Sequence, residues 1–223
     1  MFRPSTALAL VLLALAASPP TASGQPMTET KLHMAAADND AAAIATIIAQ
    51  GAEIDARDSE GRTALLLATH RNNVDAAKAL IEAGADVNAK DNMKDSAYLY
   101  AGARGHLEIL KMTLAHGADL RSTNRYGGTA LIPAAERGHV DMVRTLIAAG
   151  VDVDHVNNLG WTALLEAILL SDGGPRHQLI VQLLVAAGAN VNLADREGVT
   201  PLQHARSRGY REIEKILVTA NAR

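Results

Sequence analysis

The chain contains no cysteine, which excludes disulfide bonds, thiol chemistry and lipid attachment at a cysteine. Aromatic residues are scarce, at 3% of the 223 residues, whereas hydrophobic residues make up 48%. The core must therefore consist mainly of Ala, Leu, Ile and Val, which favours closely stacked helices over a sandwich or barrel. The chain also lacks an excess of basic charge. Its formal net charge of −3 argues against nucleic acid as a partner.

The N-terminal segment differs from the rest of the chain. An apolar run at residues 7–17 is followed by small residues at 22–24. This run is too short to span a bilayer but suits a secretory signal peptide. We expect residues 1–24 to be removed by cleavage after Gly24, leaving a periplasmic or secreted protein without a membrane segment. A retained anchor is disfavoured because the run is short and two prolines follow it.

Two marks recur along the remaining chain with one shared period. A hydroxyl residue and a glycine each return every 33 residues, except for a last interval of 38. They are Thr30, Thr63, Ser96, Thr129, Thr162 and Thr200, and Gly51, Gly84, Gly117, Gly150 and Gly188. A hydroxyl can cap the start of a helix, and glycine suits its left-handed end. The period predicts helical units that bury their apolar faces only by stacking on their neighbours.

The unit starts "GRTALLLA", "GGTALIPA", "GWTALLEA" and "GVTPLQHA", and ends such as "GADVNA", resemble the ankyrin repeat family. The resemblance covers about residues 28–220 and, with the signal peptide, indicates an exported bacterial member. It implies an all-α solenoid in which each unit has a short β-turn finger and two antiparallel helices. It also implies a non-enzymatic scaffold that binds proteins through its finger tips and the exposed faces of its first helices.

The expected organisation is a short segment at 25–29, a repeat domain at 30–220 and a tail at 221–223. The six units cover 30–57, 58–90, 91–123, 124–156, 157–194 and 195–220. Five extra residues near 171–175 fall between the two helices of the fifth unit, where we expect a specialised rim of a binding face. The third unit also departs from the pattern. Lys94 replaces a finger glycine, which predicts a different turn because a left-handed backbone costs a non-glycine residue about 1 kcal/mol.

The aromatic residues of the third unit are expected in the core. Tyr98 replaces the usual leucine, and Gly102 lies on the same helical face, which indicates a large side chain packed beside a missing one. Tyr100 is expected to be buried as well.

Recurring polar residues are interpreted as structural. His106, His139 and His177 fall at the turn between two helices, where the imidazole can bond backbone across the stack. Successive units lie roughly 10 Å apart, too far to share a metal ion with bonds of about 2 Å. We expect no metal, no cofactor and no enzymatic activity, since no hydrolase, metalloprotease or phosphate-loop motif is present. Turn capping is the interpretation of a further set, Asp55, Asp86, Asp119, Asp152 and Asn190.

Two features predict a binding surface for a protein partner. Arginines recur near the ends of the first helices and give way to Leu170 in the fifth unit. The fingers of units three to five carry apolar residues at positions expected to face solvent. Exposed apolar clusters with a polar rim usually mark contact sites. The predicted contact residues are Arg71, Met93, Arg104, Tyr126, Arg137, Leu159, Trp161, Leu169 and Leu170. As an alternative, Trp161, Leu169 and Leu170 pack against the inserted loop or a lengthened helix.

The predicted function is that of a regulator, inhibitor or protector of an exported protein, acting as a monomer or weak homo-oligomer. A self-associating structural protein would cover the same apolar residues with a second copy. A metal-binding or enzymatic protein would instead use the insertion, with His177 and two further ligands.

Overall fold

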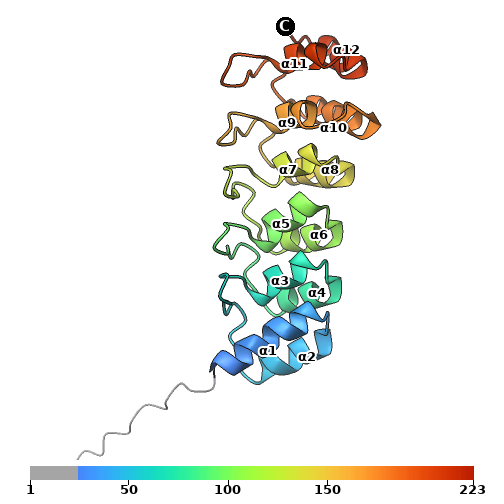
Figure 1. The fold of residues 1–223 in the computed structure, drawn as a ribbon. Helices are drawn as coiled ribbons and strands as arrows, with labels where there is room; N and C mark the ends of the chain where they lie inside the picture. The colour runs from blue at the N-terminus through green and yellow to red at the C-terminus, as the bar shows by residue number, and fades with distance from the viewer. Residues whose placement is uncertain (1–24) are drawn as a thin grey trace, which may run out of the picture.

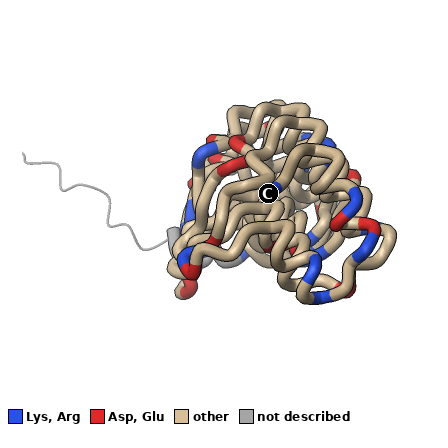
Figure 2. The backbone as a smooth tube through the Cα atoms, turned by 90° about the horizontal axis from the view of Figure 1, so that it is seen from above, with Lys and Arg blue, Asp and Glu red and all other residues tan. Residues whose placement is uncertain are grey.

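The computed structural model describes residues 25–223, in which it shows twelve helices and no strand. The helices form six pairs stacked along one axis, and the loop preceding each of the first helices α3, α5, α7, α9 and α11, here called the finger, projects from one side (Figure 1). This arrangement confirms the predicted all-α solenoid. Within the same described range, charges of both signs are distributed around the outside of the stack (Figure 2). The predicted signal peptide lies outside the described residues.

Each unit contributes one first and one second helix. The first helices are α1 (Gln25–Ala37), α3 (Ala64–His70), α5 (Ala97–Arg104), α7 (Leu131–Glu136), α9 (Ala163–Leu169) and α11 (Pro201–Ser207). The second helices are α2 (Ala41–Ala49), α4 (Val74–Glu82), α6 (Leu107–Ala115), α8 (Val140–Ala149), α10 (Pro175–Ala186) and α12 (Arg211–Thr219). Residues 25–29, expected as a segment before the repeat domain, are therefore part of α1.

The recurring hydroxyl residues cap the first helices as predicted. The side chains of Thr63, Ser96, Thr162 and Thr200 each accept a hydrogen bond from the backbone N–H three residues on. Thr30 and Thr129 are the exceptions. Thr30 lies within α1 rather than at its start. The Thr129 hydroxyl is buried without a hydrogen-bond partner. The N–H of Ile132, three residues on, donates instead to the Thr129 carbonyl at 3.3 Å. Pro133 has no N–H to donate to that carbonyl, and α7 begins only at Leu131.

The core is one continuous apolar cluster extending from Leu32 to Leu217. Tyr98 belongs to it and is fully buried, as predicted. The space beside Gly102 was predicted to accommodate Tyr98. It is instead occupied by Ala130 of the next unit, whose Cβ would lie 2.8 Å from a Cβ on residue 102. The prediction for Tyr100 is wrong. Its ring is partly exposed and stacks on His70 with centroids 4.0 Å apart.

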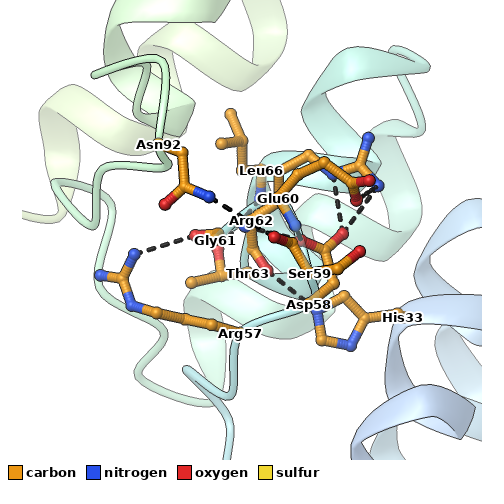
Figure 3. Close-up of polar contacts among 10 residues, drawn as sticks. All are labelled: His33, Arg57, Asp58, Ser59, Glu60, Gly61, Arg62, Thr63, Leu66 and Asn92. Atoms are coloured by element: carbon orange, nitrogen blue, oxygen red, sulfur yellow. Dashed lines mark hydrogen bonds and ion pairs between the residues drawn. The ribbon is translucent and has the colours of Figure 1, made fainter.

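A carboxylate organises the finger of the second unit (Figure 3). Asp58 Oδ1 accepts the backbone N–H groups of Glu60 and Arg62, while Asp58 Oδ2 accepts Arg62 Nε at 2.7 Å. The Arg62 carbonyl accepts a hydrogen bond from His33 in the first unit at 3.0 Å. The other fingers are likewise closed by their own Asp or Asn side chain, at Asp91, Asn124, Asn157 and Asp195.

The finger of the third unit keeps the same turn, so the prediction of a different one is wrong. Lys94 has a left-handed backbone with φ of 62°, close to the 76° of Gly61. Its N–H donates to the Asp91 carbonyl at 3.0 Å, as the N–H of Gly61 does to that of Asp58. Asp91 Oδ1 also accepts two backbone N–H groups. These bonds hold lysine in a conformation that costs roughly 1 kcal/mol.

The insertion lengthens α10 and packs against the next unit. α10 has 12 residues, compared with nine or ten in the other second helices, so His177 lies in its first turn rather than before it. The Tyr210 hydroxyl donates to the Ser171 carbonyl at 2.5 Å, and a Cβ on Gly173 would lie 2.5 Å from the Tyr210 ring. This segment of the insertion is therefore anchored to the scaffold.

We expect Gly173→Ala to lower the free energy of unfolding by about 2 kcal/mol or more, because it adds a clash with Tyr210 to the strain of a positive φ. Gly209→Ala is the matched control. Its φ of +70° resembles the +68° of Gly173, but no atom lies within 4 Å of its added Cβ, so only about 1 kcal/mol is expected. Urea unfolding measures both, and equal losses would contradict the anchored insertion.

Candidate functional site

A groove of about 410 Å³ lies between the fingers and the first helices of units three to five. Its lining includes residues at three recurring positions of successive units, together with the charged residues Asp95, Arg125 and Glu136. The floor consists of Tyr100, Pro133 and Glu166 from α5, α7 and α9. One wall consists of the finger residues Arg125, Tyr126 and Leu159, and the other of the helix-end residues Arg104, Arg137 and Leu170.

The groove brings together five of the nine predicted contact residues, namely Arg104, Tyr126, Arg137, Leu159 and Leu170. The other four do not line it. Met93 is 51% exposed on the preceding finger, and Trp161 and Leu169 are partly buried. Arg71 lies near the N-terminal end of the stack, where its Nη1 donates to the Ala37 carbonyl at 3.1 Å.

The arginines of the groove differ in their partners. Arg137 Nη1 donates to the Ala103 carbonyl in the last turn of α5 at 2.6 Å, so this residue joins two units as Arg71 does. Arg104 forms no ion pair with any described residue, and its guanidinium lies 5.3 Å from the centre of the Tyr100 ring. Arg125 lies 4.7 Å from the centre of the Tyr126 ring and 3.9 Å from an Asp95 oxygen.

Glu166 is the functional candidate that sequence reasoning missed. It is 5% exposed on α9, and its Oε1 accepts Asn157 Nδ2 at 2.7 Å. Asn157 is fixed in this orientation because its Oδ1 accepts the N–H groups of Leu159 and Trp161. Burial is the main reason why the pKa of Glu166 rises to about 7, and the negative charge of Glu136 adds to the shift.

A signal for Glu166 was present in the repeat register. The equivalent residues in units two to four are Leu67, Tyr100 and Pro133, which carry no charge. In the column formed by these equivalent positions, a carboxyl first appears at Glu166. In unit six this position is His204, whose Nε2 lies 2.6 Å from Asp195 Oδ2. Both side chains thus bond the closing Asp or Asn of their own finger. Glu166 differs in that it also lines the groove.

The other recurring polar residues contact backbone. His106 donates to the Thr69 carbonyl and His177 to the Glu136 carbonyl, which confirms the predicted bonds across the stack at these two positions. Asp86, Asp119, Asp152 and Asn190 each accept the N–H two residues on, which confirms them as turn caps. Asp55 differs, because it accepts the backbone N–H of Asp86 in the next unit.

The described range offers neither a metal site nor a membrane-spanning helix. Residues 25–223 contain no group of three or more His, Asp or Glu side chains placed to hold a metal ion. Nor does any helix of this range have the length and hydropathy needed to cross a membrane.

The chain is similar to proteins built from ankyrin repeats. A family model described as "Ankyrin repeats (3 copies)" matches residues 8–91, 32–124 and 97–195. The Escherichia coli (strain K12) protein YahD, named as an ankyrin repeat protein, is 53% identical over 58 residues, which are 26% of this chain and 29% of YahD.

Solved structures give longer matches. The crystal structure of an ankyrin repeat domain from Acinetobacter baumannii AYE is 70% identical, with a TM-score of 0.85 over 86% of this chain and 98% of that domain. The ankyrin repeat protein EF0377 is 44% identical, with a TM-score of 0.82 over 85% of this chain and 97% of its own. The ankyrin repeat domain of Bcl-3, described as a unique member of the IkappaB family, is 28% identical, with a TM-score of 0.78 over 86% of each chain.

Glu166 makes stability depend on pH. Its pKa is about 7 in the folded protein against an ordinary value of 4.5, so the folded state binds this proton more tightly than the unfolded state. The resulting contribution to the free energy of unfolding, about 3 kcal/mol, is present below pH 4.5 and is lost as the pH rises to 7.

Glu166→Gln keeps the acceptor for Asn157 but cannot ionise, so we expect it to remove this loss. Urea unfolding at pH 5 and pH 8 measures the difference, with Glu197→Gln at an exposed finger position as the control for one lost carboxylate. An unchanged difference between the two pH values in Glu166→Gln would contradict the assignment.

Proposed function

This chain belongs to the ankyrin repeat family, whose repeats generally mediate protein–protein interaction, and we propose that it binds a protein partner in the groove of units three to five. In this proposal the chain regulates, inhibits or protects an exported protein. It acts in the periplasm or outside the cell, after residues 1–24 have been cleaved. The apolar run and small residues of that segment support the location.

The observation that carries the proposal is the exposure of large apolar side chains within one groove. Tyr126, Leu159 and Leu170 are 54%, 50% and 48% exposed, and all three line the groove. Completing the burial of one such side chain contributes about 1 kcal/mol. Apolar residues surrounded by polar ones are the usual centre of a protein interface.

The arginines of the groove indicate which partner groups fit beside this centre. Arg104 has no ion pair within the described chain, and Arg125 is paired only at 3.9 Å. Both guanidinium groups lie over tyrosine rings, with donors available for a carboxylate. The groove therefore suits a segment with an aromatic or aliphatic anchor next to acidic side chains.

We expect the double variant Tyr126→Ala/Leu170→Glu to lose the partner that the wild-type protein captures from periplasmic extract. Loss of a central anchor costs 2 kcal/mol or more, which is roughly a 30-fold fall in affinity. Val218→Glu is the matched control, because Val218 is 48% exposed on α12 and does not line the groove.

Circular dichroism would establish that the variants are folded. The proposed site is wrong if the double variant captures every protein that wild type and Val218→Glu capture. Light scattering separates the self-associating alternative, in which the double variant converts a dimer to a monomer.

A further inference from the structure

The groove changes character at unit five. In units three and four the helix-end wall is arginine, at Arg104 and Arg137, and the floor residues carry no charge. In unit five the floor is a carboxyl, Glu166, and the helix-end wall is Leu170. Leu159, on the finger of the same unit, also lines the groove, so unit five contributes one carboxyl and two half-exposed leucines.

Glu166 is only partly compensated within the chain. One carboxyl oxygen accepts a hydrogen bond from Asn157, and the other makes none with any described residue. No cation of the described chain forms an ion pair with Glu166. The positive charge of Arg137 lowers the pKa of Glu166 somewhat, but the Arg137 guanidinium is bonded to the Ala103 carbonyl. A buried carboxylate in this state gains strongly from a cation that enters the groove.

The charged groups on the helices packed around α9 do not supply a cation to pair with the Glu166 carboxylate. Glu136 on α7 is negative and acts against ionisation of Glu166. The His177 ring on α10 is bonded to the Glu136 carbonyl and lies 3.7 Å from an Asp172 oxygen. The His204 ring on α11 is held by Asp195.

We propose that unit five of the groove is a subsite for one lysine or arginine side chain of the bound partner. The aliphatic stem packs between Leu159 and Leu170, and the charged head pairs with the Glu166 carboxylate. Long basic side chains bury their stems along apolar surface in this way while the head seeks a polar group. This inference rests on the proposed function and adds a chemical class to it.

The subsite also sets a direction for the partner segment. In units three and four, Arg104 and Arg125 offer donors for acidic groups, although Asp95 and Glu136 line the groove there as well, and the basic residue fits in unit five. Units repeat at roughly 10 Å, so the two charges lie about 10–20 Å apart along the groove. A segment bound in reverse would place like charges against each other, which is unfavourable.

Binding of a cation at Glu166 must be linked to loss of its proton. Because the pKa of this carboxyl is about 7, a bound cation lowers it, and the affinity for the cation rises as the pH passes through 7. A neutral side chain of the same shape gains nothing from ionisation. This difference separates a cation subsite from an apolar pocket that accepts any long side chain.

The test uses two small probes, Nα-acetyl-arginine N-methylamide and its neutral isostere Nα-acetyl-citrulline N-methylamide. Their affinities for the purified protein are measured by NMR titration at pH 5.5 and pH 8, while the Glu166 carboxyl ¹³C shift reports its pKa. We expect a preference of about tenfold for the arginine probe at pH 8, a smaller one at pH 5.5, and a lower pKa of Glu166 with the arginine probe bound.

Glu166→Gln is expected to remove the preference, and Glu197→Gln, outside the groove, to keep it. Equal affinity for the two probes at pH 8, or a preference that survives in Glu166→Gln, overturns the subsite. If the probes fail but partner capture still depends on Tyr126 and Leu170, the subsite alone is wrong. If the arginine probe binds through Glu166 but the variant Tyr126→Ala/Leu170→Glu captures every protein that wild type captures, the subsite stands and the proposed function fails.

Discussion

The structure depends on the close stacking of its first helices through small residues. Ala68, Ala101, Ala134, Ala167 and Ala205 occupy equivalent positions in successive units and are all fully buried. Small side chains allow neighbouring helices to approach closely, and the fixed spacing repeats this contact in every unit. As a result, each first helix presents its remaining positions to the same side of the stack. The groove combines those helix positions in three successive units with residues of the fingers beside them.

Unit five departs from the other units in several columns at once. It has a carboxyl on the floor, a leucine at the helix-end wall and an extra turn at the start of its second helix. The insertion is held by Tyr210, so it extends the scaffold beside the groove instead of forming a free loop. Changes that coincide in one unit, on a scaffold that otherwise repeats, are consistent with a local requirement of binding. Stability does not explain a buried, half-compensated carboxyl there, because ionisation of Glu166 opposes folding near neutral pH.

The fold could be predicted from sequence because the hydroxyl residues near helix starts and the glycines after helix ends recur with the same spacing of 33 residues. The exposure of Leu170 could also be predicted, since the equivalent residue is arginine in units two, three, four and six. Leu159 could be predicted because it continues the apolar finger positions Met93 and Tyr126. The predictions for the turn at Lys94 and for the burial of Tyr100 were wrong. Lys94 keeps the left-handed turn because Asp91 bonds the surrounding backbone. Tyr100 lines the groove because it lies two residues from the buried Tyr98, roughly 200° around the same helix. Burial of Glu166 depends on the next unit and on Asn157, contacts that spacing alone does not reveal.

The central claim is that a partner protein occupies the groove of units three to five. The most direct measurement places a photo-crosslinking residue, benzoylphenylalanine, at Tyr126 in the groove and, in a second variant, at Val218 on α12. After illumination of cells that make each variant, we expect one discrete crosslinked protein at position 126 and none at 218. The same adduct at both positions, or an adduct at 218 alone, would contradict it.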